Sequence, residues 1–176
     1  HRLTRFPVAV KSLLKRDYSE KFDWENAAKE LKLLKLFNHP NIVKLFDCVT
    51  SENEIVLVME LVCGGELFEY CVKEGPLEEV EARRFFRDIT GGLQYMHDHG
   101  IVHNDVKMEN CLLDKNMRVK LIDFGLSSSL LNAEKFEACG TKTYASPEVL
   151  TGVNYRGFHV DVWALGVLLY VFFFFC

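Results

Sequence analysis

Short apolar runs and one amphipathic stretch alternate along the first third of the chain. Residues 6–14, 42–49 and 54–60 are apolar-rich runs of strand length, and residues 56–59 are apolar without interruption. An uninterrupted run of this kind favours a strand that is buried on both faces. Residues 18–37 instead repeat apolar side chains at intervals of three and four, which is typical of an amphipathic helix. The pattern therefore predicts a small sheet with one helix.

The remainder of the chain is predicted to be mainly helical. One helix is expected to begin near residues 64–68 and a longer one to cover residues 77–99, before a short apolar strand at residues 119–122. The glycine pair at 91–92 costs a helix about 1 kcal/mol per glycine, which indicates close packing. Residues 162–176 carry no charge, but a membrane span needs about 20 apolar residues, so a core helix is expected. The expected core face of the long helix consists of Val80, Phe85, Phe86, Ile89, Leu93 and Met96.

Composition narrows the class of protein without identifying its chemistry. The 176 residues suit one ordinary domain, and a hydrophobic fraction of 49% is enough for a packed core. The net charge of −4 argues against a protein that binds nucleic acid or an anionic membrane through a basic surface. The six cysteines show no CxxC or Cys/His ligand spacing, so reduced thiols are expected rather than disulfides or zinc. With no visible signal peptide, we expect an intracellular, cytoplasmic protein, with the nucleus as the alternative.

Candidate chemistry is concentrated in one polar stretch and in one carboxylate that follows it. Asp105 could accept a proton from an attacking hydroxyl, and Lys107 could neutralise a moving phosphoryl group. Asn110 and Asp123 offer oxygen ligands of the hard kind that Mg²⁺ prefers. Phosphoryl transfer requires little beyond positioning and charge stabilisation. These four residues are therefore sufficient candidates for a phosphoryl-transfer site.

The same residues carry a resemblance to a known family. Residues 103–110, His-Asn-Asp-Val-Lys-Met-Glu-Asn, resemble the catalytic loop of the protein kinases, and Asp-Phe-Gly at 123–125 resembles their metal-binding motif. The family usually has arginine where this chain has Asn104. The resemblance implies that Asp105 is the catalytic base and Lys107 the charge stabiliser, with ATP as phosphoryl donor and Mg²⁺ as metal.

The resemblance assigns further positions to the nucleotide. Val-Ala-Val-Lys at 8–11 is similar to the strand whose lysine holds the α- and β-phosphates, and residues 59–62 resemble the hinge that contacts adenine. Glu30 is expected to pair with Lys11, although an isolated helix glutamate is normally solvated. Glu66 is assigned to the ribose, with a favourable helix-dipole contact as the alternative. The full implied set is Ala9, Lys11, Glu30, Met59, Glu60, Val62, Glu66 and Leu112.

A third group of positions is implied to be structural or regulatory. Its members are His103, Phe124, Thr141, Glu148 and Asp161. The first two are expected to stack with Leu34 and Leu45 in the internal spine of the family. Thr141 matches the threonine that hydrogen-bonds the catalytic aspartate and lysine in serine/threonine kinases, and Asp161 matches the residue that anchors the catalytic loop. Residues 146–148 read Ser-Pro-Glu where Ala-Pro-Glu is usual, and the arginine that normally pairs with this glutamate is absent from the chain.

The resemblance covers almost the whole chain and implies an α+β, two-lobed protein-kinase fold. We expect a small β-rich lobe over residues 1–59, a hinge at 60–65 and a mainly helical large lobe over 66–176. The glycine-rich loop that precedes Lys11 in the family is not in the chain, and the last helix ends early relative to the family. The sequence therefore predicts a kinase domain that is incomplete at both ends.

Two functions from different classes are compatible with these motifs. The first is an ATP-dependent serine/threonine protein kinase, closest to the calcium/calmodulin-dependent and AMP-activated branch, which residues 64–70 and 121–127 resemble. Glu66 and Glu109 match positions at which that branch recognises arginine upstream of the target hydroxyl, so basic protein substrates are expected. The alternative is a pseudokinase or scaffold, or an inactive fragment of a kinase. The intact catalytic and metal-binding positions favour the enzyme.

Several departures from the family concern the activation segment. Glu137 occupies the position at which the family usually has a phosphorylated threonine. The positions of the basic residues that would bind this phosphate are occupied by Asn26, Asn104 and Ser128. An unpaired buried arginine is costly, so the joint loss of site and pocket is physically coherent. We expect a segment that is ordered without phosphorylation at that position, with drift in a decaying gene copy as the alternative. The phenylalanine run also leads us to expect that residues 173–176 lie outside the natural domain.

Overall fold

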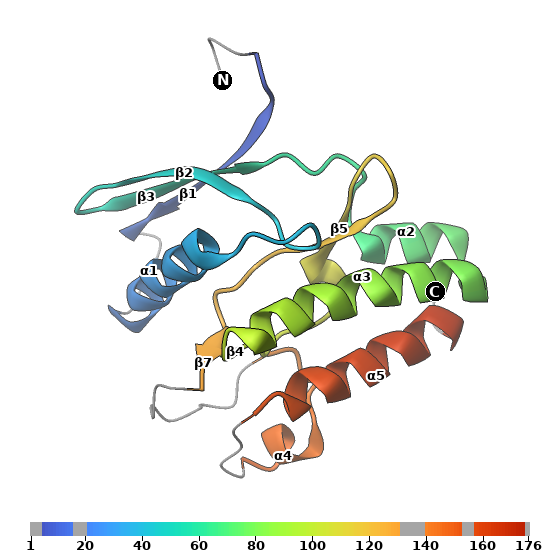
Figure 1. Cartoon of the computed structure of the whole chain (residues 1–176). Helices are drawn as coiled ribbons and strands as arrows, with labels where there is room; N and C mark the ends of the chain where they lie inside the picture. The colour runs from blue at the N-terminus through green and yellow to red at the C-terminus, as the bar shows by residue number, and fades with distance from the viewer. Residues whose placement is uncertain (1–4, 16–20, 131–139, 153–156, 175–176) are drawn as a thin grey trace.

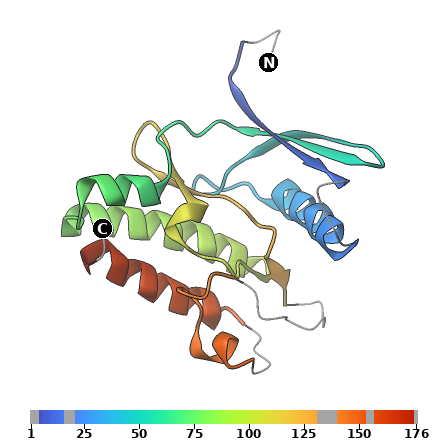
Figure 2. The same cartoon turned by 180° about the vertical axis from the view of Figure 1, so that it is seen from behind.

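The computed structural model describes most of the chain, and Figures 1 and 2 show it from opposite sides. The described residues are 5–15, 21–130, 140–152 and 157–174. Within residues 21–26 only the backbone is described, so the side chain of Asn26 lies outside the described residues. Glu137 and residues 175–176 also lie outside them.

The helices and strands that the hydrophobic pattern predicts occur in the predicted order. The elements are β1 (Val8–Leu14), α1 (Lys21–Leu36), β2 (Leu45–Thr50), β3 (Glu54–Glu60), α2 (Leu67–Glu74), α3 (Glu79–Asp98), β4 (Ile101–Val102), the 3₁₀ helix η2 (Met108–Asn110), β5 (Cys111–Leu113), β6 (Val119–Leu121), β7 (Ser128–Ser129), α4 (Pro147–Leu150) and α5 (His159–Phe174). Among these, β4, η2, β5, β7 and α4 were not predicted. The expected α+β class and two-lobed arrangement are confirmed, with a β-rich lobe followed by a mainly helical one.

The small lobe is an antiparallel sheet of three strands in the order β1-β3-β2, with α1 against one of its faces (Figure 1). Burial alternates along β3, because Ile55 and Leu57 are buried in the core while Val56 and Val58 are only half-buried. The prediction that β3 is buried on both faces is therefore wrong. On the other face of the sheet, Val58 of β3 lies opposite Val10 of β1, and Val10 is 62% exposed.

The large lobe is built around α3, which runs side by side with α5 (Figures 1 and 2). The predicted core face of α3 is buried at Phe85, Ile89, Leu93 and Met96. The prediction for Val80 is wrong, because its side chain is 83% exposed. Val80 lies nine positions before Ile89, which is two and a half helical turns, so it projects from the opposite side of the helix.

Two close contacts join the elements of the large lobe. A Cβ atom placed on Gly92 would lie 2.8 Å from Leu121 Cδ1, so the glycine allows α3 to approach β6 closely, as predicted. On α5, Phe172 is fully buried, with its ring centroid 6.4 Å from that of Phe85. The expected core helix is thus buried along one face, whereas Val162 remains exposed on another. No helix in the described residues has both the length and the apolarity that crossing a bilayer requires.

Candidate active site

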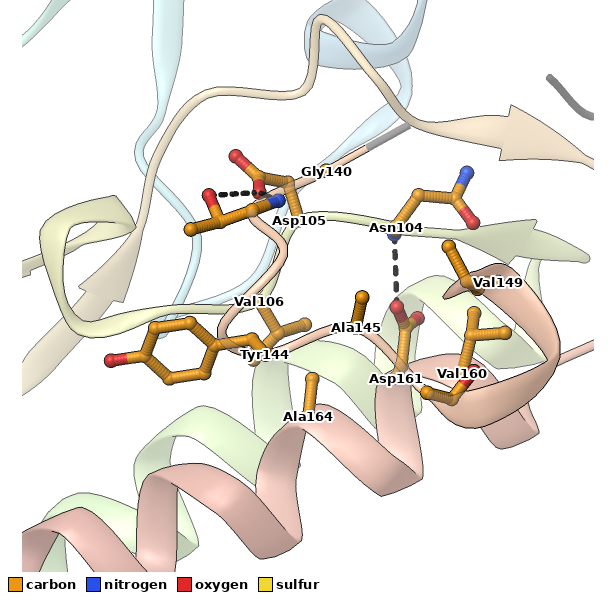
Figure 3. Close-up of a pocket in the computed structure, with 12 residues that line it drawn as sticks. Asn104, Asp105, Val106, Gly140, Tyr144, Ala145, Val149, Val160, Asp161 and Ala164 are labelled. Carbon is orange, nitrogen blue, oxygen red and sulfur yellow. Dashed lines mark hydrogen bonds between the residues drawn. The ribbon is translucent and has the colours of Figure 1, made fainter. Parts of the chain in front are cut away.

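The catalytic loop is anchored by a buried carboxylate at the start of α5. Asp161 is 1% exposed, and its Oδ1 accepts a hydrogen bond from the backbone N–H of Asn104 at 2.9 Å, drawn in Figure 3. Its Oδ2 accepts the backbone N–H of His103 at 2.9 Å and lies 2.7 Å from Nε2 of His97 on α3. A carboxylate with this number of partners fixes the backbone immediately before Asp105.

The Asp105 carboxylate is surrounded by donors. Its Oδ1 accepts hydrogen bonds from the backbone N–H and from the hydroxyl of Thr141, both at 3.0 Å. Its Oδ2 lies 2.9 Å from Nδ2 of Asn110 and 2.7 Å from Nζ of Lys107. Burial alone would raise the pKa of Asp105, but the hydrogen bond and charge of Lys107, together with the hydrogen bonds from Thr141 and Asn110, hold this pKa below its ordinary value. Asp105 is therefore ionised at neutral pH and able to accept a proton.

Thr141 connects the two charged residues of the loop. Lys107 Nζ donates to the Thr141 hydroxyl oxygen at 2.8 Å, and that hydroxyl in turn donates to Asp105. The preceding residue, Gly140, has φ 96°, and a Cβ there would lie 2.6 Å from the Asn104 carbonyl oxygen. Only glycine permits this approach, so Gly140 brings Thr141 against the catalytic loop.

Two side chains offer the oxygen donors that a magnesium ion would need. Asn110 Nδ2 is used in hydrogen bonds to the carbonyl and carboxylate oxygens of Asp105, which leaves Oδ1 of its amide as the acceptor. Asp123 is exposed, and its Oδ1 accepts the backbone N–H of Gly125 at 3.3 Å. Mg²⁺ usually takes one or two protein side chains and fills its remaining positions with water and phosphate oxygens. The donor set therefore fits magnesium.

An ion pair links the sheet to α1. Lys11 Nζ lies 3.1 Å from Oε1 of Glu30, and the two side chains are 40% and 8% exposed. The alternative of a freely solvated Glu30 does not hold, because the residue is buried and paired. The pair points the β1 lysine toward α1 and holds it there.

Aromatic rings connect α1 to the catalytic loop. The Phe124 ring lies 5.3 Å from that of Phe37 and 5.5 Å from that of His103, centroid to centroid. Leu34 is buried in the same core, and Leu45 packs against it. Burial lowers the pKa of His103, so its ring is neutral, and Nδ1 accepts the backbone N–H of Asp105 at 3.3 Å.

The positions assigned to the nucleotide are contributed by several strands. Ala9 pairs with Met59 across β1 and β3, and Glu60 ends β3. Val62 follows on the hinge and packs against the core. Glu66 forms an isolated antiparallel bridge with Leu112. It is the N-cap of α2, makes no side-chain capping bond and is exposed.

Sequence reasoning missed a polar link behind the hinge. Lys120 is 9% exposed, and its Nζ lies 2.9 Å from Oε1 of Glu60 and 2.9 Å from the carbonyl oxygen of Pro40. It thereby joins β6 of the large lobe to the hinge and to the loop after α1. A lysine flanked by apolar residues in a short strand was the only available signal.

A second missed link holds the β5–β6 hairpin against α3. Both side-chain oxygens of buried Asp88 accept hydrogen bonds from the Arg118 guanidinium, at 2.6 and 2.8 Å.

Near the end of the activation segment, Glu148 has His159 as a partner at 3.2 Å, where the family would have an arginine.

Comparison with known families agrees with this arrangement. Residues 1–175 match the family model described as protein kinase domain. Protein kinases are transferases that move a phosphoryl group from ATP to protein substrates, with magnesium neutralising the phosphate charge. The match extends over the sheet, the hinge, the catalytic loop and α5, and we conclude that the chain belongs to the protein kinase domain family.

Proposed function

We propose that this kinase domain phosphorylates serine and threonine hydroxyls of protein substrates, using ATP. The observation that carries this proposal is the arrangement of Asp105, Lys107 and Thr141, in which one hydroxyl bridges the carboxylate and the ammonium group. The resemblance of this threonine and of the lysine two positions after Asp105 to serine/threonine kinases supports the choice of acceptor.

The proposed mechanism assigns one task to each side chain. Asp105 accepts the proton of the substrate hydroxyl as that oxygen attacks phosphorus, and Lys107 stabilises the charge on the phosphoryl oxygens. Lys11, oriented by Glu30, binds the nucleotide phosphates. Asn110 and Asp123 would hold magnesium, which when bound supplies positive charge beside the phosphates. His103 and Asp161 contribute indirectly, by setting the position of Asp105.

The proposed division of the domain follows the boundaries of the elements. The small lobe comprises residues 1–59, the hinge residues 60–65 and the large lobe residues 66–176. Support comes from β3, which ends at Glu60, and from α2, which begins at Leu67.

Basic residues upstream of the target hydroxyl are the proposed recognition element. Glu66 is exposed at the start of α2, and Glu109 Oε2 is buried without a hydrogen-bond partner among the described residues. A guanidinium group from a substrate can form charge-assisted hydrogen bonds with the exposed Glu66 carboxylate and with the accessible part of the half-buried Glu109 side chain. This chemistry supports placement in the calcium/calmodulin-dependent and AMP-activated branch.

One set of assays tests both the proposed acceptor, a serine or threonine hydroxyl, and the proposed base, Asp105. The full-length protein should transfer phosphate from ATP to serine- and threonine-containing peptides but not to tyrosine-containing ones, as measured by mass spectrometry. Asp105→Asn should lower kcat by roughly 10²- to 10⁴-fold, the usual contribution of a general base. Asp47→Asn, an exposed aspartate on β2, is the control and should leave kcat unchanged. Nucleotide binding without transfer to any peptide would favour the scaffold alternative.

Substrate preference requires its own measurement. A peptide array should show selection for arginine before the target residue, and Glu66→Gln or Glu109→Gln should weaken that selection through a higher KM. Glu69→Gln, an exposed neighbour on α2, is the matched control. Preference for acidic or proline-directed sites would contradict the proposal.

Activity without phosphorylation at residue 137 is the proposed regulatory property. Asn104 Nδ2 donates hydrogen bonds to the Ser128 hydroxyl at 2.8 Å and to the Leu126 carbonyl at 2.9 Å. Two positions where the family has basic residues are thus bonded to each other. Phosphatase-treated full-length protein should keep its activity, and Glu137→Ala should change it little. A large loss traced to Thr141 or Thr143 would contradict this.

A further inference from the structure

A small cavity lies where the catalytic loop meets the end of the activation segment and the start of α5 (Figure 3). About 20 Å³ of it is open to the centre of a water molecule, and about 10–15 Å³ suffices for one water. Apolar and polar side chains share its walls, because Val106, Val149, Val160 and Ala164 line it together with Asp105, Thr141 and Asp161. Two residues that depart from the family pattern, Asn104 and Ser146, also line it.

Asn104 contributes a buried acceptor. Its amide orientation is set by the Leu126 carbonyl, which can only accept and therefore faces Nδ2. Oδ1 is consequently the second amide atom, and it is buried without a hydrogen-bond partner among the described residues. In Figure 3 this oxygen is directed toward the Val149 side of the cavity.

Ser146 contributes a buried hydroxyl. The residue is 1% exposed, and its Oγ likewise has no hydrogen-bond partner in the described part of the chain. It is the N-cap of α4, where a serine hydroxyl usually accepts a backbone N–H of the first turn, yet it makes no such bond. Its hydroxyl is therefore available to a different partner.

We propose that one buried water molecule occupies this cavity, donating to Asn104 Oδ1 and bonding to the Ser146 hydroxyl. The partner must be able to donate to an amide oxygen and be small enough for the cavity, and water meets both conditions. Buried waters typically make two to four hydrogen bonds to polar groups that would otherwise be unsatisfied. An unsatisfied buried polar atom is costly, and both residues line this cavity, so an occupant that bonds to both atoms would be favourable.

The bridge makes Asn104 a joint between the two ends of the activation segment. Its Nδ2 holds the beginning of the segment at Ser128, and its Oδ1 holds the end of the segment at Ser146 through the water. Thr141 lies between these two points and contacts Asp105, the neighbour of Asn104. Asn104 and Ser146 are thus positioning residues for the substrate-binding segment, an assignment that rests on the proposed kinase function.

A double-mutant cycle on the full-length protein tests the bridge by thermal unfolding. Ser146→Ala should lower Tm by about 2–4 °C, the effect of losing one hydrogen bond in a protein of this size. In the Asn104→Ala background the same substitution should lower Tm by about 1 °C or less, because the bridge is already lost. Equal losses in both backgrounds, or no loss in either, would overturn the proposal. Asn38→Ala, an exposed asparagine, is the control background and should leave the Ser146→Ala loss unchanged.

Two further measurements separate the bridge from the proposed function. A high-resolution crystal structure should show a water within about 3 Å of both atoms, and a cavity water that contacts only one of them would overturn the bridge. In activity assays, Ser146→Ala should raise KM for the peptide several-fold while KM for ATP stays constant. An equal rise in both would remove the positioning role. A wild-type protein with no activity would refute the proposed function but leave the Tm cycle and the crystal structure as tests of the bridge.

Discussion

The two sides of the active site are held in different ways. On the large-lobe side, Asp105 and Asp161 are nearly buried, and each carboxylate has at least three polar partners. On the small-lobe side, Lys11 reaches the site from β1 with one described partner, Glu30, and 40% of its side chain remains exposed. The proposed base, Asp105, is thus fixed by several buried bonds, whereas Lys11, which we propose binds the nucleotide phosphates, depends on a single partner.

The large-lobe side of the site is therefore held more rigidly than the small-lobe side. Buried bonds are strong and costly to break, so they hold the catalytic loop in one geometry. An ion pair that is open to solvent on one side contributes only ~0–1 kcal/mol. The surroundings of Asp105 are therefore held more firmly than those of Lys11. Four substitutions would break or sharpen this contrast, in decreasing order of their expected effect on the free energy of unfolding.

Asp161→Ala should have the largest effect. It leaves the buried backbone N–H groups of His103 and Asn104 without an acceptor, at roughly 1–3 kcal/mol for each. Urea denaturation should show a total loss of about 2–6 kcal/mol. Asp98→Ala, an exposed aspartate at the end of α3, is the control. A loss no larger than that of the control would mean that other contacts hold the loop.

Lys120→Met should have the next largest effect. It removes the cation that bonds Glu60 and the Pro40 carbonyl behind the hinge, and hydrogen bonds to charged groups contribute about 1.5–3 kcal/mol. Because the two lobes meet at this point, nucleotide affinity measured by calorimetry should also fall. Lys115→Met in the exposed β5–β6 turn provides the comparison. Unchanged affinity would show that the hinge position does not depend on this lysine.

His103→Phe should remove a pH dependence. Burial lowers the pKa of His103 despite the opposing charges of Asp161, Asp105 and Asp123. The unfolded chain therefore takes up this proton first, so the wild type should lose stability as pH falls below about 6.5. Between pH 7.5 and 5.5 the loss from this one group is at most about 1.4 kcal/mol. Denaturation at both pH values should show a smaller drop for the variant, and an identical drop would mean that His103 does not titrate differently on folding.

Lys11→Met should have the smallest effect on stability and a large effect on activity. The variant is made together with Glu30→Gln, because Lys11→Met alone would leave the buried Glu30 carboxylate unpaired; with both charges removed, the free energy of unfolding should change by ~0–1 kcal/mol. Phosphoryl transfer should nevertheless fall by more than about tenfold, because a charge on the phosphates is lost. Comparing unfolding with single-turnover kinetics separates the two. A stability loss comparable to that of Asp161→Ala would remove the contrast between the two sides.

The sequence predicts local features of this molecule better than its long-range polar contacts. The order of the predicted elements and most of the core face of α3 follow from periodicity, and the error at Val80 arose because this residue lies two and a half turns before Ile89, on the opposite side of the helix. The expected pair of Lys11 and Glu30 came from the family resemblance. Lys120 and Glu60 are sixty positions apart, so only the folded chain brings them together.

The conformation of Asp123 also bears on how this position can vary during evolution. Its φ of 62° lies in a region that asparagine and glycine tolerate and that β-branched residues avoid. Asparagine would keep the backbone and one oxygen donor, glycine would keep the backbone alone, and valine would keep neither. Selection for folding and selection for the proposed metal binding should therefore constrain this residue separately. A library selected only for folded protein should retain glycine here, whereas one selected for catalysis should not.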